Sequence, residues 1–162
     1  MESSAEVARV DDPQAIVPPP LTGLGGWLVL IGIGQILGCI RIFLTMLSTY
    51  TSKETYLAMQ KLPAAMELEV LLNAALVGIV GFTTYAYFAK KRLFPIVFTI
   101  EAAASVFMIP LDDLLVSAAT TATFQSLFDP QDAGHIGGAV ITSLIWIPYV
   151  FLSKRVENTF VN

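Results

Sequence analysis

Ionisable residues inside apolar sequence are the first feature that could carry chemistry, and Glu101 stands well inside a long apolar run. A carboxyl group in hydrocarbon must be hydrogen-bonded, protonated or in contact with water, because a lone charge there costs about 2.5–3.5 kcal/mol on insertion scales. Two interpretations stay open for Glu101: a proton or ion site, or a neutral side chain that ties helices together. Neighbours for the first interpretation are Gln35, Tyr149, Thr83 and Thr84.

A second set of polar residues stands in the other apolar runs. Counting at 1.5 Å per residue from the start of each run places Arg41 about 25 Å along the first and Asp112 and Asp113 about 28 Å along the third. Asn73 falls at a similar height. These residues form either an intramembrane polar cluster, in which Arg41 pairs with one aspartate, or separate groups at the outer interface that extend to phosphate and water. Consecutive side chains in a helix diverge by about 100°, so only one aspartate can face Arg41.

The patterns of known catalytic sites are absent from the sequence. His135 is the single histidine, so a nucleophile inside the membrane would lack an imidazole base. Neither zinc-ligand spacing nor a phosphate-binding loop occurs. Glu101 and Asp112 stand about three turns apart in one run and cannot converge from separate helices. We therefore expect no catalytic residue, metal or cofactor, and an intramembrane enzyme is the least favoured alternative.

The composition shows what must position these residues. Hydrophobic residues make up 55% of the chain and charged residues 14%, compared with about 25% charged in soluble proteins. Each apolar run is long enough, or nearly so, to cross a bilayer core of about 30 Å as a helix. The sequence predicts an all-α fold, an integral membrane four-helix transmembrane bundle within residues 21–162. Its four predicted spans are residues 24–47, 68–89, 93–119 and 136–152.

The segments between and beyond these spans give weaker signals. Residues 1–20 are acidic and proline-rich, which predicts a disordered cytoplasmic tail and not a signal peptide. Residues 51–67 suit either a short helix at the interface or a solvated loop. Residues 124–128 either dip into the headgroups or extend the third span. Residues 153–160 predict one or two helical turns that contact a partner or, in the favoured interpretation, anchor the chain at the membrane surface.

Basic residues near the span ends predict the orientation. Because Lys and Arg are retained in the cytoplasm, the second connection and the C-terminus should lie there, which places both termini in the cytoplasm and the acidic third connection outside. No basic run exceeds three residues, so nucleic acid is not expected as a partner. The residues that carry this argument are Lys90, Lys91, Arg92, Lys154 and Arg155.

Small residues four apart could bring helices close together. This spacing serves either packing within one chain or association of chains, and the motif alone does not separate the two. The expected partners are therefore the lipid bilayer and either a homo-oligomer or a larger membrane complex. The pairs are Gly34 with Gly38, Ala74 with Gly78, and Gly134 with Gly138.

Two motifs at the ends of the apolar region are familiar. Gly25-Gly26-Trp27-Leu28 opens the first span, and the chain closes with Trp146, Pro148-Tyr149, Ser153, Arg155-Val156 and Thr159-Phe160. With these motifs the sequence resembles a family of small bacterial inner-membrane proteins catalogued as domain of unknown function 2569. The resemblance covers about residues 21–161. It implies four spans and assigns no activity or functional residue.

These observations predict a multi-pass protein of the bacterial inner membrane. The first hypothesis for its function is a structural or accessory component that associates with itself or with another membrane complex. The alternative is a small proton- or ion-coupled transport unit in which Glu101 titrates and Arg41, with Asp112 or Asp113, gates the outer side.

Overall fold

The computed structural model describes residues 21–120 and 130–162, and their regular structure is entirely helical. Four helices are long and apolar enough to cross a membrane, with spans at Trp27–Tyr50, Pro63–Phe88, Phe94–Ala119 and Asp132–Leu152. The chain is therefore a multi-pass membrane protein with an all-α fold, as the sequence predicts. The helices are α1 (Trp27–Tyr50), α2 (Lys53–Lys61), α3 (Pro63–Phe88), α4 (Phe94–Ala119), α6 (Pro130–Leu152) and α7 (Lys154–Thr159).

The outer surface of the bundle explains why it needs lipid. Large apolar side chains point away from the protein along all four long helices, among them Phe43 at 66% and Leu144 at 70% exposure. A water-soluble protein rarely exposes apolar patches of this extent, because hydrating them is unfavourable. In the hydrocarbon core of a bilayer the same apolar side chains are surrounded by apolar lipid chains, so their exposure carries no such cost.

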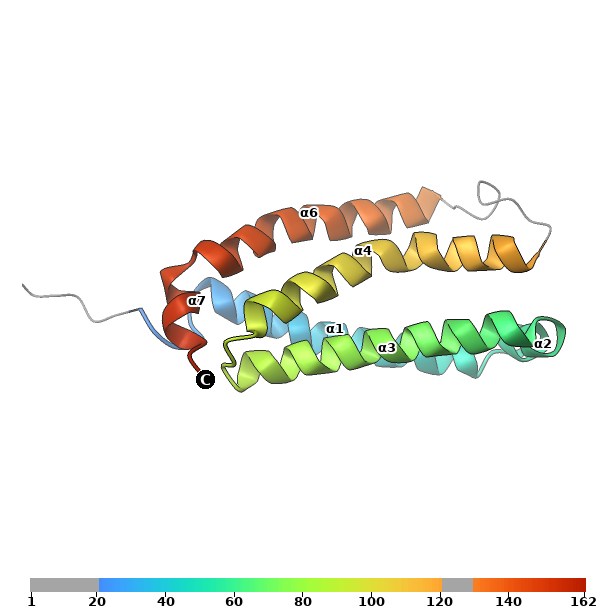
Figure 1. Ribbon diagram of the computed structural model, residues 1–162, viewed down its shortest axis with the longest axis horizontal. Coiled ribbons are helices and arrows are strands. Elements are labelled where there is room, and N and C mark those ends of the chain that lie inside the picture. The colour runs from blue at the N-terminus through green and yellow to red at the C-terminus, as the bar shows by residue number, and fades with distance from the viewer. Residues whose placement is uncertain (1–20, 121–129) are drawn as a thin grey trace, which may run out of the picture.

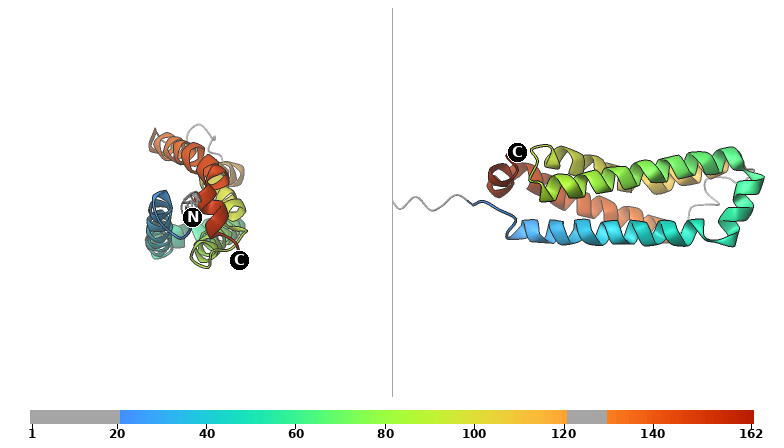
Figure 2. Two further views of the ribbon diagram at one scale, coloured as in Figure 1. Left: turned by 90° about the vertical axis from the view of Figure 1, so that its left-hand side faces the viewer. Right: turned by 90° about the horizontal axis from the view of Figure 1, so that it is seen from below.

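The long helices run antiparallel and follow one another in an arc (Figures 1 and 2). α3 packs against α1 and α4, and α4 packs against α6, so α1 and α6 form the two ends of the arc. The short helices mark the ends of the molecule (Figure 1). We call these the α7 end, where α1 begins and α6 finishes, and the α2 end, where α3 begins.

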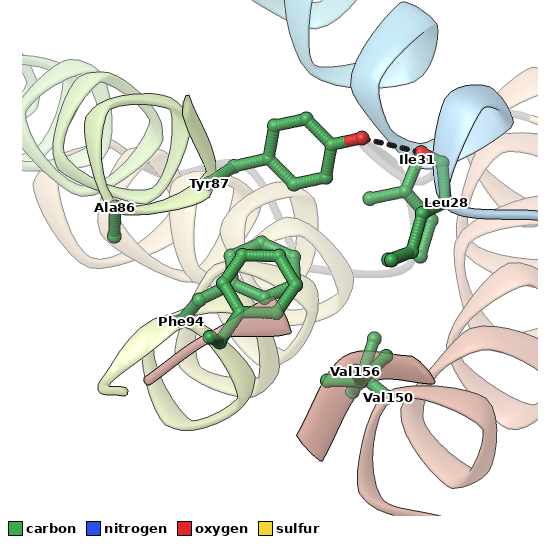
Figure 3. Close-up of a cluster of buried hydrophobic side chains, with 8 residues drawn as sticks. Leu28, Ile31, Ala86, Tyr87, Phe94, Val150 and Val156 are labelled. Carbon is green, nitrogen blue, oxygen red and sulfur yellow. Dashed lines mark hydrogen bonds between the residues drawn. The ribbon is translucent and has the colours of Figure 1, made fainter. Parts of the chain in front are cut away.

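The buried core lies at the α7 end. Tyr87 of α3, Phe94 of α4 and Phe160 near the C-terminus form an aromatic group, in which the rings of Phe94 and Phe160 stack with their centroids 4.4 Å apart. The Tyr87 hydroxyl donates a hydrogen bond of 2.6 Å to the Leu28 carbonyl (Figure 3). Dense packing at one end leaves the rest of the bundle more open. The core residues are Leu28, Ile31, Ala86, Tyr87, Phe94, Val150, Val156 and Phe160.

Two helices begin earlier than the apolar pattern predicts, and both begin at a proline. α3 starts at Pro63, five residues before the predicted span, and α6 starts at Pro130 instead of residue 136. Proline suits the first turn of a helix because its missing N–H has no partner there. Asp132 adds a favourable negative charge to the first turn of α6. The first turn of α6 is polar, and Glu67 and Glu69 interrupt the apolar sequence near the start of α3, so hydropathy did not place either start.

The structure also decides between alternatives left open for the short segments. Residues 51–67 contain a real helix, α2, whose N-cap Ser52 accepts a hydrogen bond from the Thr55 amide. The residues after α6 form α7, as predicted. α4 stays helical through Pro110 and changes direction about midway, as expected of a helix interrupted by proline (Figure 1). The predictions for residues 1–20 and 124–128 concern residues outside those described.

Candidate functional site

A cavity of about 740 Å³ lies inside the bundle, and all four long helices line it. Part of its wall is made of glycine: Gly34 and Gly38 on α1 and Gly138 on α6. A Cβ atom added at any of the three would meet no atom within 4 Å, so the missing side chains leave free space. A cavity of this size is large enough for a small organic ligand, for which about 300–1,000 Å³ is usual.

Glu101 lies on the wall of this cavity and is hydrogen-bonded, as its depth predicts. The buried amide of Gln35 on α1 donates to both carboxyl oxygens of Glu101 on α4, each at 3.2 Å. The Thr84 hydroxyl of α3 lies 3.0 Å from Gln35 Oε1 and 2.9 Å from the Val80 carbonyl, and its single proton can go to either oxygen. Three helices thus meet through one polar network, which Cys39 extends by a contact of 3.2 Å between its sulfur and the Thr84 hydroxyl.

The other two neighbours expected for Glu101 have structural partners. Thr83 is fully buried, and its hydroxyl donates to the Ile79 carbonyl at 2.9 Å. The ring of Tyr149 packs edge-on against Trp146, with centroids 5.8 Å apart. The Thr83 side chain also interacts with the Glu101 carboxyl, so Gln35 and Thr83 both contact this group directly, and Thr84 acts through Gln35.

Arg41 and Asn73 line the same cavity nearer the α2 end. The Asn73 amide donates a hydrogen bond of 3.2 Å to the Tyr50 hydroxyl, which joins α3 to the end of α1. His135 of α6 also lines this cavity. From the sequence, His135 is expected in the outer loop just before the fourth predicted span, residues 136–152, whereas the structure places it within α6.

The two aspartates lie elsewhere. Asp112 lines a separate cavity of about 290 Å³ between α2, α3 and α4, together with Glu54 and Glu69. Asp113 has a buried Oδ2 atom that lacks a hydrogen-bond partner within the described part of the chain. Across those residues no ion pair joins Arg41 to either aspartate, so the pair, which was one of the two alternatives, is not formed in the structure. Counting residues gave similar heights but could not give the rotation of each helix about its axis.

The residues that carry the family resemblance come together at the α7 end. The rings of Trp27 and Trp146 lie 6.2 Å apart and connect α1 to α6 across the arc. Arg155 of α7 lies against the chain just before α1, where a Cβ atom at Gly25 would be 2.7 Å from its Nη1 atom. The two motifs, more than 100 residues apart in sequence, therefore form one structural unit.

Comparison with known proteins identifies a family for the chain. The model of a family described as a protein of unknown function, DUF2569, matches residues 21–161. The chain belongs to this family. No curated protein and no solved structure matches it.

The DUF2569 region thus contains two distinct features. The α7 end is tightly packed and includes residues of both motifs, whereas Glu101 and Arg41 on the cavity wall lie outside the motifs. Gln35 could be noticed in the sequence as an uncharged polar residue at membrane depth. The cavity itself had no sequence signal, because it depends on which faces of four helices converge.

Proposed function

We propose that this DUF2569 protein is a structural or accessory component of the bacterial inner membrane that binds a neighbouring membrane helix through α3. The observation that carries the proposal is an exposed face of small residues on α3: Ala74, Gly78 and Gly81. A Cβ atom added at Gly78 or Gly81 would meet no atom within 4 Å, so packing within the described chain does not require either glycine.

The shape of this face suits a helix. Small residues let two helix backbones approach closely, and in lipid such close packing is a main source of helix association. Larger side chains border the small residues, with Leu71 at 65% and Tyr85 at 57% exposure. The face is therefore an exposed stretch of small residues, bounded along α3 by Leu71 and Tyr85, that a second helix can approach closely. No catalytic role is part of this proposal.

Crosslinking inside the membrane tests the proposal. A photoreactive amino acid placed at Gly81 should form an adduct with a protein, and the mass of the adduct tells a second copy from another membrane protein. The same amino acid at Ala103, an exposed position on α4, is the matched control and should label lipid alone. Adding Gly78→Leu should abolish the adduct, because the bulky side chain blocks close approach.

Two results would contradict this function. Labelling of lipid alone at position 81 would mean that α3 contacts no protein there. An adduct that survives Gly78→Leu would mean that the small-residue face is not the contact.

A second candidate function is favoured by the position of Glu101. A carboxyl group on the wall of a cavity between four spans is the kind of group that proton- and ion-coupled transporters use. Under this candidate, Glu101→Gln should abolish proton or cation flux in reconstituted vesicles, whereas Glu67→Gln, at an exposed position near the α2 end, should leave it intact. Unchanged flux in Glu101→Gln would remove the candidate.

A further inference from the structure

The cation on the cavity wall lacks a protein partner. Arg41 lines the cavity, and among residues 21–120 and 130–162 neither a carboxylate nor a carbonyl oxygen bonds its guanidinium group. An arginine at membrane depth is costly unless an anion or water meets it. A guanidinium group has five N–H donors in a flat fork that fits the oxygens of phosphate.

Other donors converge on the same space. His135 reaches the cavity from α6, and Asn73 and Tyr50 reach it from α3 and the end of α1. Glu101 is the one acidic residue among the described residues that line the cavity. Its partner Gln35 lies six residues before Arg41 on α1, which separates the two positions by about 9 Å along the helix axis. The part of the cavity nearer the α2 end therefore favours an anion.

The same cavity also has apolar walls and a route to lipid. Its apolar lining includes Ile42 and Met46 of α1 and Met108 and Ile109 of α4. α1 and α6 both line the cavity and form the ends of the arc (Figure 2), and they are not among the helix pairs that pack closely, so close helix packing does not seal the cavity between them. A molecule with an anionic head and an apolar tail matches both kinds of wall.

The height of Arg41 fits a lipid headgroup. From residue 41 to the last residue of α1, Tyr50, the helix rises about 13 Å. A long arginine side chain can extend several ångström toward that end, so its guanidinium group lies below the end of α1, where it can meet the phosphate of a lipid that enters the cavity.

We infer that this cavity binds one anionic phospholipid, whose phosphate is held by Arg41 and whose acyl chains leave between α1 and α6. The surrounding membrane supplies such a molecule, and the apolar walls favour it over a free phosphate ion. The inference does not depend on the proposed contact at α3, because the two involve different faces.

Native mass spectrometry of the full chain tests the inference. The protein is released from nanodiscs that contain equal amounts of phosphatidylglycerol and phosphatidylcholine. We expect one retained phosphatidylglycerol, with occupancy about tenfold lower in Arg41→Gln, equivalent to about 1.4 kcal/mol. Lys61→Gln, which removes an exposed cation at the same end of the molecule, is the matched control and should retain the lipid.

A second variant separates loss of the site from loss of the fold. Gly38→Leu keeps Arg41 and fills free space on the cavity wall, and it should also lose the lipid. Equal retention of both lipids, or unchanged retention in Arg41→Gln or Gly38→Leu, would overturn the inference. Release of the lipid by millimolar inorganic phosphate would overturn it in favour of a small-anion site.

Discussion

At the scale of single residues, the absence of a side chain at Gly32 determines how closely α1 and α3 approach. A Cβ atom there would lie 2.8 Å from the Tyr87 hydroxyl and 2.9 Å from its ring. We predict that Gly32→Ala lowers the free energy of unfolding by about 1–3 kcal/mol, because Tyr87 must move away from the Leu28 carbonyl. Unfolding of the detergent-solubilised protein by a denaturing detergent measures the change.

Gly34→Ala is the control for this prediction, since it lies on the same helix with no atom within 4 Å of the added Cβ. Equal loss of stability in the two alanine variants would show that the effect comes from α1 itself and not from Tyr87.

The bond between Gln35 and Glu101 gives a second prediction at this scale. Because the amide and carboxyl groups contact each other directly, Gln35→Ala and Glu101→Ala should not be additive. We expect a coupling of about 0.5–1.5 kcal/mol in a double-mutant cycle of unfolding free energies. The pair Gln35→Ala and Asn73→Ala should be additive, because Asn73 bonds Tyr50 instead. A coupling of zero for the first pair would contradict the network.

At the scale of elements, the residues after α7 bind the turn between α3 and α4 through backbone hydrogen bonds. The Arg92 amide donates to the Asn162 carbonyl at 2.7 Å, and the Asn162 amide donates to the Lys90 carbonyl at 3.3 Å. Phe160 is 5% exposed and stacks on Phe94. The C-terminal segment therefore joins the ends of α3, α4 and α6 into one unit.

Removing the central side chain of this segment should loosen the α7 end. We predict that Phe160→Ala lowers the free energy of unfolding by about 3 kcal/mol, because it leaves a cavity beside Phe94 and Tyr87. The same detergent titration measures it, and limited proteolysis should then cut within residues 153–162. Val161→Ala, at a position 51% exposed, is the control and should change little. Stability equal to that of the control would mean that the segment does not hold the helix ends together.

The elements also show how far sequence reasoning reaches. The length of the apolar runs predicted the four spans. Helical spacing predicted the turns after the fourth span and, as one of two alternatives, the helix within residues 51–67. The early starts of α3 and α6 were missed because acidic residues interrupt the apolar sequence near each start, although Pro63 and Pro130 mark them. The site was predicted in part. The depth of Glu101 in the membrane indicated that its carboxyl group needs a polar neighbour such as Gln35. The separation of Arg41 from Asp112 depends on the rotation of each helix about its axis, which no periodic pattern in these uniformly apolar helices specifies.

At the scale of the whole molecule, the protein is packed at one end and hollow beyond it. Most of its buried apolar side chains belong to the cluster at the α7 end, whereas the cavity extends from Trp146 to Tyr50 along the bundle. The glycines on the cavity wall have no side chains that could fill the cavity. Such a bundle can keep the α7 end fixed while α1 and α6 accommodate a ligand between them.

The two ends also differ in charge, and this difference gives the last prediction. Basic residues at the α7 end are Lys90, Lys91, Arg92, Lys154 and Arg155, compared with Lys53 and Lys61 at the α2 end. Because basic residues near span ends stay in the cytoplasm, we predict that the α7 end is cytoplasmic in an inner membrane.

Accessibility of single cysteines tests this orientation. In a Cys39→Ser background, which removes the one native cysteine, a membrane-impermeant maleimide applied to intact cells should label Gln60→Cys in α2 and not Glu157→Cys in α7. Both positions are exposed, so permeabilised cells should show labelling of each. Labelling of position 157 alone in intact cells would reverse the orientation. Labelling of both in intact cells would contradict the crossing of the membrane by α3, α4 and α6, because these three spans separate α2 from α7.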